Sequence, residues 1–411
     1  GTLIEFFIAD SDPSGYGEGE TWLFTDSEGS GSDLDADAGE FFFQVALPGG
    51  VSDGTEITAT ATSGTGNTSE FSLNETVVLA AEITGTIFVD EAGDGLTDGP
   101  IGVAPNLWEA GARIELYRAG PDGNPDGVDD TYIGFTTSSA VDGTYSFSGL
   151  SADVYYVTVD SQGVDDGPYN GTYSGLDTWA EQTYGPIGAA SFDGVSTWTF
   201  APAAGAFYGG AQWDVSDDLS PANSLPGAEH IARVDATGGD VTDVDFGFSF
   251  NVVTTTRGGS AGQDPGAGAG QRSVQGSLRQ FLTNANAQDR SNVMRFVPAA
   301  PTNASGSGGN WWRISNTGKL PLLEYNDTTI DGTAYCAWSD GTQGCAAVTA
   351  VRDPNGGTLG YAGPVGTGPD GVVGTADEQT LAALDKPELE IQGVSTIADG
   401  LEVRGNDIVI R

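Results

Sequence analysis

The stretch "VTDVDFGFSF", residues 241–250, decides the fold class. Val244, Phe246, Phe248 and Phe250 alternate with polar or small residues. Successive side chains of a β-strand point to opposite faces of a sheet, so the alternation predicts a strand with one buried apolar face. Similar β-branched and aromatic runs, separated by turn residues, lie upstream: "EITGTIFVD", "ARIELYRAG", "TYIGFTTSS", "GTYSFSGL" and "DVYYVTVDS". Together these runs predict a β-sandwich over residues 81–251.

A long insertion, residues 161–235, separates the last two of these strands and is rich in aromatic residues and glycine. Insertions of this length within a compact domain are usually functional or form a lobe of their own. Exposed aromatic rings here would stack on sugar rings or anchor a protein partner. The alternative is that they form a small private core. The candidate ligand-binding aromatics are Trp179, Trp198 and Trp213.

The segments on either side are also predicted to be built from strands. Residues 1–80 contain apolar runs such as "TLIEFFIAD" and "TEITATATS" between Gly/Ser/Asp turns, which predicts a small β-sandwich. Residues 252–272 are predicted to be a Gly-rich linker. Residues 273–411 begin with one helix, "GSLRQFLTNANAQ", and continue as short strands separated by loops. Recurring short strands predict a solenoid in which each rung covers the apolar face of the one before it.

The last strand pattern, "GLEVRGNDIVIR", ends at Arg411 without a polar cap. An uncapped rung leaves a strand edge that invites pairing. We therefore expect either that the chain continues beyond Arg411 or that a neighbouring subunit covers this end by self-association.

Composition restricts the classes of partner. The chain has 58 acidic and 14 basic residues, a formal net charge of −44, and no basic residue before Arg113. Charge of this sign repels nucleic acid and anionic lipid, so we expect neither as a partner. No apolar stretch approaches the length of about 18 residues that a membrane-spanning helix needs, so we expect no membrane insertion.

The chain contains two cysteines, Cys336 and Cys345, which bracket a short Gly-containing loop. A disulfide between them would close that loop and would require an oxidising compartment. Two unpaired thiols are the alternative.

Three segments carry resemblances to known families. "EITGTIFVDEAGDGLTDG", followed by "ARIELYRAG", "DGTYSFSGL" and "DVDFGFSF", resembles the calcium-binding, prealbumin-like B-type repeats of serine–aspartate-repeat surface proteins, which are also Cna-B-like. "IEFFIADSDPSGYGEGETWLF" with "ITATATSGTGNTSEFS" resembles the bacterial Ig-like module of very large surface proteins. "VQGSLRQFLTNANA", "MRFVP", "TTIDGT" and "PELEIQG" are similar to the entry segment of right-handed parallel β-helices in adhesin-like proteins.

The resemblances imply an all-β chain: tandem β-sandwich domains followed by a right-handed parallel β-helix segment. They also imply an extracellular or cell-surface location. Related collagen-adhesin modules often carry a Lys–Asn crosslink, but the lysines of this chain, Lys319 and Lys386, both lie outside residues 81–251. Any stiffening of that domain must therefore come from metal ions.

The acidic loop "PDGNPDGVDD", residues 121–130, is the strongest candidate metal site. Calcium prefers several oxygen ligands at alternate positions of a sharply turning loop. Gly127 stands at the turn, and the bidentate glutamate of a helical EF-hand is replaced by Ile133. The alternative is a solvated acidic loop. The predicted Ca²⁺ ligands are Asp122, Asn124, Asp126, the Val128 carbonyl and Asp130.

A second loop, "DEAGDGLTD", has the same spacing, with Ala92 in place of one oxygen ligand. The corresponding loop of the B-type repeats binds metal, so the resemblance supports this weaker site. Its candidate residues are Asp90, Asp94, Leu96 and Asp98.

No catalytic motif is recognisable in the sequence. His230 is the one histidine, and it is expected to be structural. Nucleophile-elbow, zinc-protease and P-loop motifs are missing from the sequence. We therefore expect a non-enzymatic structural segment of an extracellular fibre or adhesin, with modules that are rigidified by calcium and stack end to end. A carbohydrate- or protein-binding adhesion module is the alternative, and a fragment of a polysaccharide-degrading β-helix enzyme is less favoured.

Overall fold

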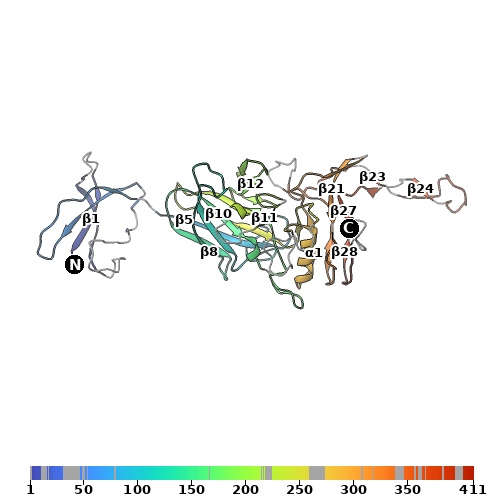
Figure 1. Ribbon diagram of the computed structural model, residues 1–411, viewed down its shortest axis with the longest axis horizontal. Helices are drawn as coiled ribbons and strands as arrows, with labels where there is room; N and C mark the ends of the chain where they lie inside the picture. The colour runs from blue at the N-terminus through green and yellow to red at the C-terminus, as the bar shows by residue number, and fades with distance from the viewer. Residues whose placement is uncertain are drawn as a thin grey trace. The chain divides into compact units, whose positions relative to one another are not determined.

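The computed structural model describes residues 2–10, 16, 18–30, 47–48, 51–52, 54–77, 80–165, 167–213, 215, 217, 225–258, 274–306, 309–316, 318–337, 347–355, 358–359, 363–365, 367–381, 384–393 and 401–411. The chain forms two compact units (Figure 1). The first comprises Gly1–Ala81 with Gly149–Ala152 and Thr237–Gly239, and the second comprises Glu82–Ser148, Asp153–Ala236 and Asp240–Arg411. In the part of the chain that is described, no helix has the length and apolar character needed to cross a bilayer.

The described strands of the first unit form one four-stranded antiparallel sheet in the order β2-β1-β3-β4. Its strands are β1 (Leu3–Ala9), β2 (Gly19–Ser27), β3 (Glu56–Thr62) and β4 (Glu75–Thr76). The Phe6 and Phe24 rings stack across the β1–β2 pair with centroids 4.7 Å apart. The unit is therefore a β-structure, as predicted, but a second sheet layer is not seen among its described residues.

Two sheets form the first part of the second unit. The smaller is antiparallel, in the order β15-β10-β7-β8, and consists of β7 (Arg113–Arg118), β8 (Thr131–Thr137), β10 (Val154–Asp160) and β15 (His230–Asp235). The larger has the order β14-β11-β16-β5-β6, with β9 also paired to β5. Its strands are β5 (Ala81–Asp90), β6 (Asn106–Trp108), β9 (Thr144–Leu150), β11 (Glu181–Gly185), β14 (Gly205–Ala206) and β16 (Phe246–Ser249).

The two sheets pack against each other as a β-sandwich. The ring of His230, from β15, meets the ring of Phe248, from β16, edge to face at 5.0 Å. The apolar residues of the opening stretch, Val244, Phe246, Phe248 and Phe250, are all buried. The buried face that the alternation predicts is therefore confirmed.

The insertion contributes more than a lobe on the surface. Its strand β11 lies within the larger sheet, while β12 (Ala190–Phe192) and β13 (Trp198–Phe200) form a separate hairpin. Short 3-10 turns lie at Ser161–Gly163 and Leu225–Gly227. Insertion residues and residues from the smaller sheet share one apolar cluster: Tyr117, Tyr156, Ala190, Leu225, Ala228 and Ile231.

The predicted helix is confirmed as α1 (Leu278–Ala287), which begins after Ser277, whose side chain accepts a hydrogen bond from the Gln280 amide. The predicted linker differs from the structure at its start. Val252 and Val253 are buried and form β17, which pairs in parallel with β19 (Arg295–Phe296). These strand bonds and apolar contacts bring the chain on both sides of residue 251 into one compact unit. Residues 259–272 of the predicted linker lie outside the described residues.

Parallel pairing dominates the remainder of the second unit. β18 (Asn292–Val293), β22 (Thr328–Ile330) and β28 (Val409–Ile410) form one parallel ladder. β21 (Gly309–Asn316) pairs in parallel with β27 (Leu389–Gly393) and antiparallel with β20 (Ala304–Gly306). Two antiparallel pairs complete the part: β23 (Thr358–Leu359) with β26 (Leu384–Asp385), and β24 (Gly363–Val365) with β25 (Gln379–Leu381).

Helix α1 packs against these short strands, beside β21, β27 and β28 in Figure 1. Its residues Leu278, Phe281 and Leu282 share an apolar core with Trp312 and Ile314 of β21. The spacing of the three helical residues, i, i+3 and i+4, places them on one face of the helix. The described residues show short parallel ladders over this core. They do not show the predicted solenoid.

Candidate functional site

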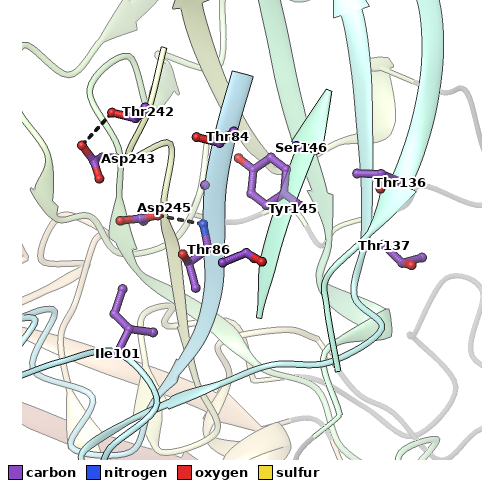
Figure 2. A pocket seen from close by; sticks show the side chains of 12 residues that line it. Thr84, Thr86, Ile101, Thr136, Thr137, Tyr145, Ser146, Thr242, Asp243 and Asp245 are labelled. Atoms are coloured by element: carbon purple, nitrogen blue, oxygen red, sulfur yellow. Dashed lines mark hydrogen bonds between the residues drawn. The ribbon is translucent and has the colours of Figure 1, made fainter. Parts of the chain in front are cut away.

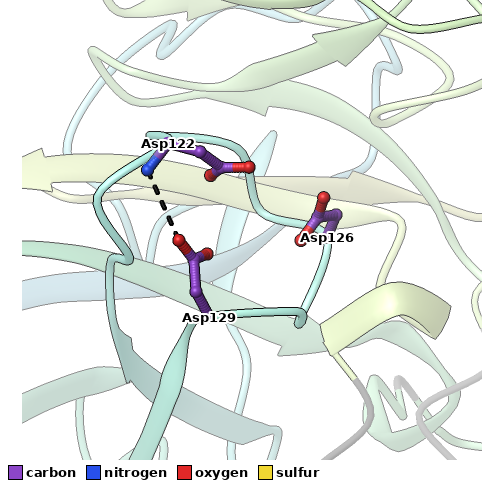
Figure 3. A group of neighbouring side chains, drawn as sticks. All are labelled: Asp122, Asp126 and Asp129. Carbon is purple, nitrogen blue, oxygen red and sulfur yellow. Dashed lines mark hydrogen bonds between the residues drawn. The ribbon is translucent and has the colours of Figure 1, made fainter.

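The acidic loop between β7 and β8 brings three carboxylates together (Figure 3). Oxygen atoms of Asp122, Asp126 and Asp129 all lie within 4.8 Å of one another. The Asp122 amide donates a hydrogen bond of 3.4 Å to Oδ2 of Asp129. Gly127 supplies the turn with a left-handed φ of 74°. Three hard oxygen donors at this spacing suit a divalent cation such as Ca²⁺.

The structure changes the predicted ligand set of this loop at its end. The Asp130 carboxylate turns toward the loop backbone and accepts bonds of 2.9 Å from the amides of both Gly120 and Gly127. Burial raises the pKa of Asp130. Asp129 joins the cluster instead, and it packs so closely on Gly120 that a Cβ there would lie 2.1 Å from its Oδ1. Alternate spacing alone would not have selected Asp129, because it is out of phase with Asp122 and Asp126.

The other two predicted ligands of this loop lie beside the cluster. The Asn124 side-chain amide donates a hydrogen bond of 3.1 Å to Oδ2 of Asp122. The Val128 backbone amide donates a hydrogen bond of 2.9 Å to Oδ1 of Asp126. The Val128 side chain is exposed. Both residues therefore order the carboxylates through hydrogen bonds.

The second acidic loop has a buried first position. Asp90 is fully buried, and its two oxygens accept bonds from the amides of Gly93 at 3.0 Å and Gly95 at 2.8 Å. Burial raises the pKa of Asp90 to about 7. Burial and the neighbouring Asp98 raise the pKa of Asp94, whose Oδ1 accepts from the Leu96 amide.

The second loop is less well arranged for a cation than the first. The Asn106 side-chain amide bridges two residues of this loop: its nitrogen donates a hydrogen bond of 3.1 Å to the Leu96 carbonyl, and its oxygen accepts one of 2.9 Å from the Asp98 amide. That carbonyl, a predicted ligand, is therefore already engaged. Within the described part of the chain, three carboxylates come within 4.8 Å of one another only in the loop of Asp122.

The candidate aromatics have three different environments. Trp179 is 1% exposed, and its indole Nε1 donates 3.0 Å to Ser161 Oγ. Trp179 therefore does not offer the exposed ring that the prediction requires, because the inserted chain folds this side chain into the interior. Trp198 packs against the apolar cluster of the insertion, with its ring centroid 4.7 Å from that of Phe192. Trp213 lines a pocket of about 490 Å³.

His230 lies in a buried polar network. Its Nδ1 lies 2.8 Å from Gln182 Oε1, and its Nε2 lies 3.1 Å from the side-chain nitrogen, Nε2, of Gln275. Since the Gln275 nitrogen can only donate, Nε2 accepts and the ring proton is on Nδ1. Burial lowers the pKa of His230 to about 3, so the ring stays neutral at physiological pH.

A broad hydroxyl-rich groove of about 650 Å³ lies over β5 and β9 (Figure 2). The Asp245 carboxylate accepts a hydrogen bond of 2.7 Å from the Thr86 backbone amide. Burial raises the pKa of Asp245. Tyr145 is buried and donates its hydroxyl to the Val244 carbonyl at 2.6 Å. The groove therefore has no ring free for stacking among its lining residues. Its outer lining is polar: Thr84, Thr86, Thr136, Thr137, Thr144, Ser146, Thr242 and Asp243.

Cys336 is disulfide-bonded and buried. The other cysteine of the chain, Cys345, lies outside the described residues. A disulfide is typical of proteins that fold in oxidising compartments.

Comparison with known proteins gives little further information. No protein-family model matches the chain, and no curated protein matches it. Among solved structures, the chain is similar to BcpA, the major pilin subunit of Bacillus cereus, with 10% identity and a TM-score of 0.19 over 61% of this chain and 59% of the pilin. A variant of the same pilin aligns with 13% identity and a TM-score of 0.16, over 49% of this chain and 52% of the pilin.

The chain thus spans less than two thirds of the pilin structure that it matches. At TM-scores of 0.19 and 0.16, these similarities say nothing about the architecture or the role of this chain.

Proposed function

We propose that the chain is a non-enzymatic structural segment of an extracellular fibre or surface adhesin, whose units assemble end to end. The disulfide-bonded Cys336 favours an oxidising, extracellular location. The burial of His230 and its neutral state favour a non-catalytic role for the one histidine. In this proposal residues 1–80 are an Ig-like sandwich, and residues 81–251 are a B-type, prealbumin-like sandwich.

In the same proposal, residues 273–411 form the first rungs of a right-handed parallel β-helix. The parallel ladder of β18, β22 and β28 supports this, because the three strands pair in parallel in the order in which they occur along the chain. Parallel bridges between Phe296 and Ala334, and between Leu323 and Val403, follow the same order. Successive rungs of a solenoid pair in this way.

One observation carries the assembly proposal: among the described residues, nothing pairs with the outer edges of the last strands of these ladders. β27 and β28 are the final members of their sheets. Leu389, Leu401 and Ile408 pack against the core from this end but are only partly buried. Val409 is 47% exposed and Ile410 is 60% exposed. An open strand edge with apolar side chains is a surface for pairing with another strand.

The assembly proposal predicts that the purified chain associates through this edge and that the double variant Val409→Asp/Ile410→Asp does not. Charged side chains on an edge strand oppose pairing because they would be desolvated on association. Sedimentation velocity over a range of concentrations measures the effect. The matched control is the double variant Val141→Asp/Val195→Asp, which places the same two charges at valines that are 76% and 83% exposed and lie outside β27 and β28. A wild-type chain that remains monomeric, or a double variant that assembles normally, would contradict the proposal.

Calcium is the ion that we propose for the loop of Asp122. The carboxylates of Asp122, Asp126 and Asp129 would hold it, and its charge would remove their mutual repulsion. Asp130 and Gly127 would keep the loop in the shape that the three carboxylates require. The chain's own contribution is a loop that is already ordered by amide hydrogen bonds.

A ligand-binding role is the second candidate function. It is favoured by the pocket that Trp213 lines, because an aromatic residue of the insertion there borders a cavity of ligand size.

A further inference from the structure

The pocket beside Trp213 is built from three distant parts of the second unit. The β12 strand and residues 208–213 of the insertion form one side, and the chain after β19 with the segment 352–354 forms the other. Its volume of about 490 Å³ falls in the range of small-molecule sites. Its lining residues are Ser191, Phe192, Tyr208, Gly210, Ala211, Trp213, Ala299, Pro301, Thr302, Arg352 and Pro354.

Arg352 is the one charged residue in this lining. Its guanidinium lies 4.8 Å from the centroid of the Trp312 ring, and its Nη1 donates 3.1 Å to the Pro298 carbonyl. Trp312 is itself fully buried and is held by a bond of 2.9 Å from its Nε1 to the Ala300 carbonyl. The cation is therefore fixed in place from one side, beside the pocket.

No carboxylate pairs with Arg352 in the described part of the chain. The chain has 58 acidic and 14 basic residues, so a carboxylate partner would be easy to supply. Other cations find such partners: Arg313 pairs with Glu390 at 2.8 Å, and Arg411 with Asp331 at 3.0 Å. A partly desolvated guanidinium gains most from an anion that binds it with two parallel hydrogen bonds. The presence of Arg352 in the lining therefore favours an anionic ligand for this pocket.

The side of the pocket that carries Phe192 is held by packing and by backbone hydrogen bonds. Phe192 packs on Trp198, and its amide donates 2.7 Å to the Ala211 carbonyl. The Ala211 amide in turn donates 2.6 Å to the Glu229 carbonyl. Gly210 must be glycine, because its φ is 58° and a Cβ would lie 2.7 Å from the Glu229 carbonyl oxygen. Preorganised rings of this kind bind the flat apolar face of a ligand at little entropic cost.

We propose that this pocket binds a carboxylated sugar of the uronic-acid type. Arg352 would pair with the carboxylate, and Trp213 and Phe192 would contact the ring face. The Ser191 and Thr302 hydroxyls, which also line the pocket, can exchange hydrogen bonds with sugar hydroxyls. An acidic peptide side chain would use the arginine but would leave the aromatic side and the hydroxyls without partners. The proposal rests on the second candidate function, ligand binding at this pocket, and does not depend on the structural role proposed above.

The test uses the full chain with sodium glucuronate and sodium galacturonate as probes. Isothermal titration calorimetry and ligand-observed NMR measure their binding. Glucose, galactose and glutamate are the comparison ligands. We expect at least one uronate to bind about tenfold or more tightly than its neutral sugar and than glutamate. Arg352→Gln and Trp213→Ala should each weaken that binding by about tenfold or more.

Arg404→Gln is the matched control, because Arg404 is an exposed arginine that pairs with Glu402 outside the pocket. It should leave uronate binding unchanged. Equal binding of glucuronate and glucose would overturn the proposal, as would tighter binding of glutamate, undiminished binding by Arg352→Gln, or no uronate binding by the wild type. Should Arg352→Gln fail to fold, the ligand comparison and Trp213→Ala decide the outcome alone.

Discussion

At the residue scale, two buried acids have the clearest physical consequence. Glu181 is buried and accepts bonds from the Gln182 amide at 2.8 Å and the Thr254 hydroxyl at 3.1 Å. Burial raises the pKa of Glu181 to about 7. Burial, with a smaller contribution from Asp160, raises the pKa of Asp217 to about 8. Folding of this unit therefore favours the protonated acids.

These pKa shifts predict a chain that loses stability as the pH rises. A folded-state pKa above the unfolded value stabilises the fold fully below the unfolded pKa, and the stability is lost as the pH rises through the folded pKa. The melting temperature, measured by circular dichroism with a chelator present, should fall between pH of about 4, near the unfolded pKa values, and about 8, the higher of the two folded values. Glu181→Gln should flatten that fall, with a gain on the order of 3 kcal/mol at the alkaline end.

Glu324→Gln, at an exposed glutamate, is the control and should follow the wild-type curve. A wild-type melting temperature that rises over this pH range would show that both acids are ionised without cost in the folded chain.

At the element scale, the loop between β7 and β8 combines a fixed backbone with mutually repelling carboxylates. Asp130 ties the two ends of the loop together through Gly120 and Gly127. Asp122, Asp126 and Asp129 then face one another within 4.8 Å. Close unpaired carboxylates near a surface repel by about 1–4 kcal/mol for each pair. The loop is thus an element that a divalent cation would stabilise.

Calcium is therefore expected to raise the melting temperature of the wild-type chain at constant ionic strength, and a chelator to lower it again. Saturation at about 100 times the dissociation constant would add about 2.7 kcal/mol. The double variant Asp126→Asn/Asp129→Asn should lose most of this increment, as followed by differential scanning calorimetry. Asp289→Asn, at an exposed aspartate outside the loop, should keep it. A wild-type chain that responds equally to calcium and to sodium would exclude a specific site in this loop.

At the scale of the whole molecule, the net charge of −44 acts on every encounter between copies. Like-charged chains repel over a Debye length of about 10 Å at 0.1 M salt. An edge that pairs through apolar and backbone groups gains nothing from this field. Assembly and long-range charge therefore oppose each other in this protein.

Self-association should consequently increase with sodium chloride, from about 0.02 M to about 0.5 M, because added salt screens the repulsion. Light scattering at fixed protein concentration measures it. The Val409→Asp/Ile410→Asp variant should remain unassociated at every salt concentration. Association that weakens as salt is added would instead indicate an interface held by opposite charges, which would contradict an apolar strand edge.

Much of this molecule is determined by local patterns in the sequence. The alternation in residues 241–250 requires a strand with a buried face, because side chains of a strand alternate between its two faces. The spacing of Leu278, Phe281 and Leu282 requires the helix for a similar reason, and Ser277 caps it. The turn at Gly127 also follows from the sequence, since glycine tolerates a left-handed φ.

Tertiary structure alone decided which side chains face one another. It buried Trp179, placed Asp129 in the cluster in place of Asp130, and left Arg352 beside Trp213 across more than a hundred residues of chain. Local periodicity fixes the face on which a side chain lies. The partner across that face depends on how distant segments pack, and short-range sequence patterns hold no record of that packing.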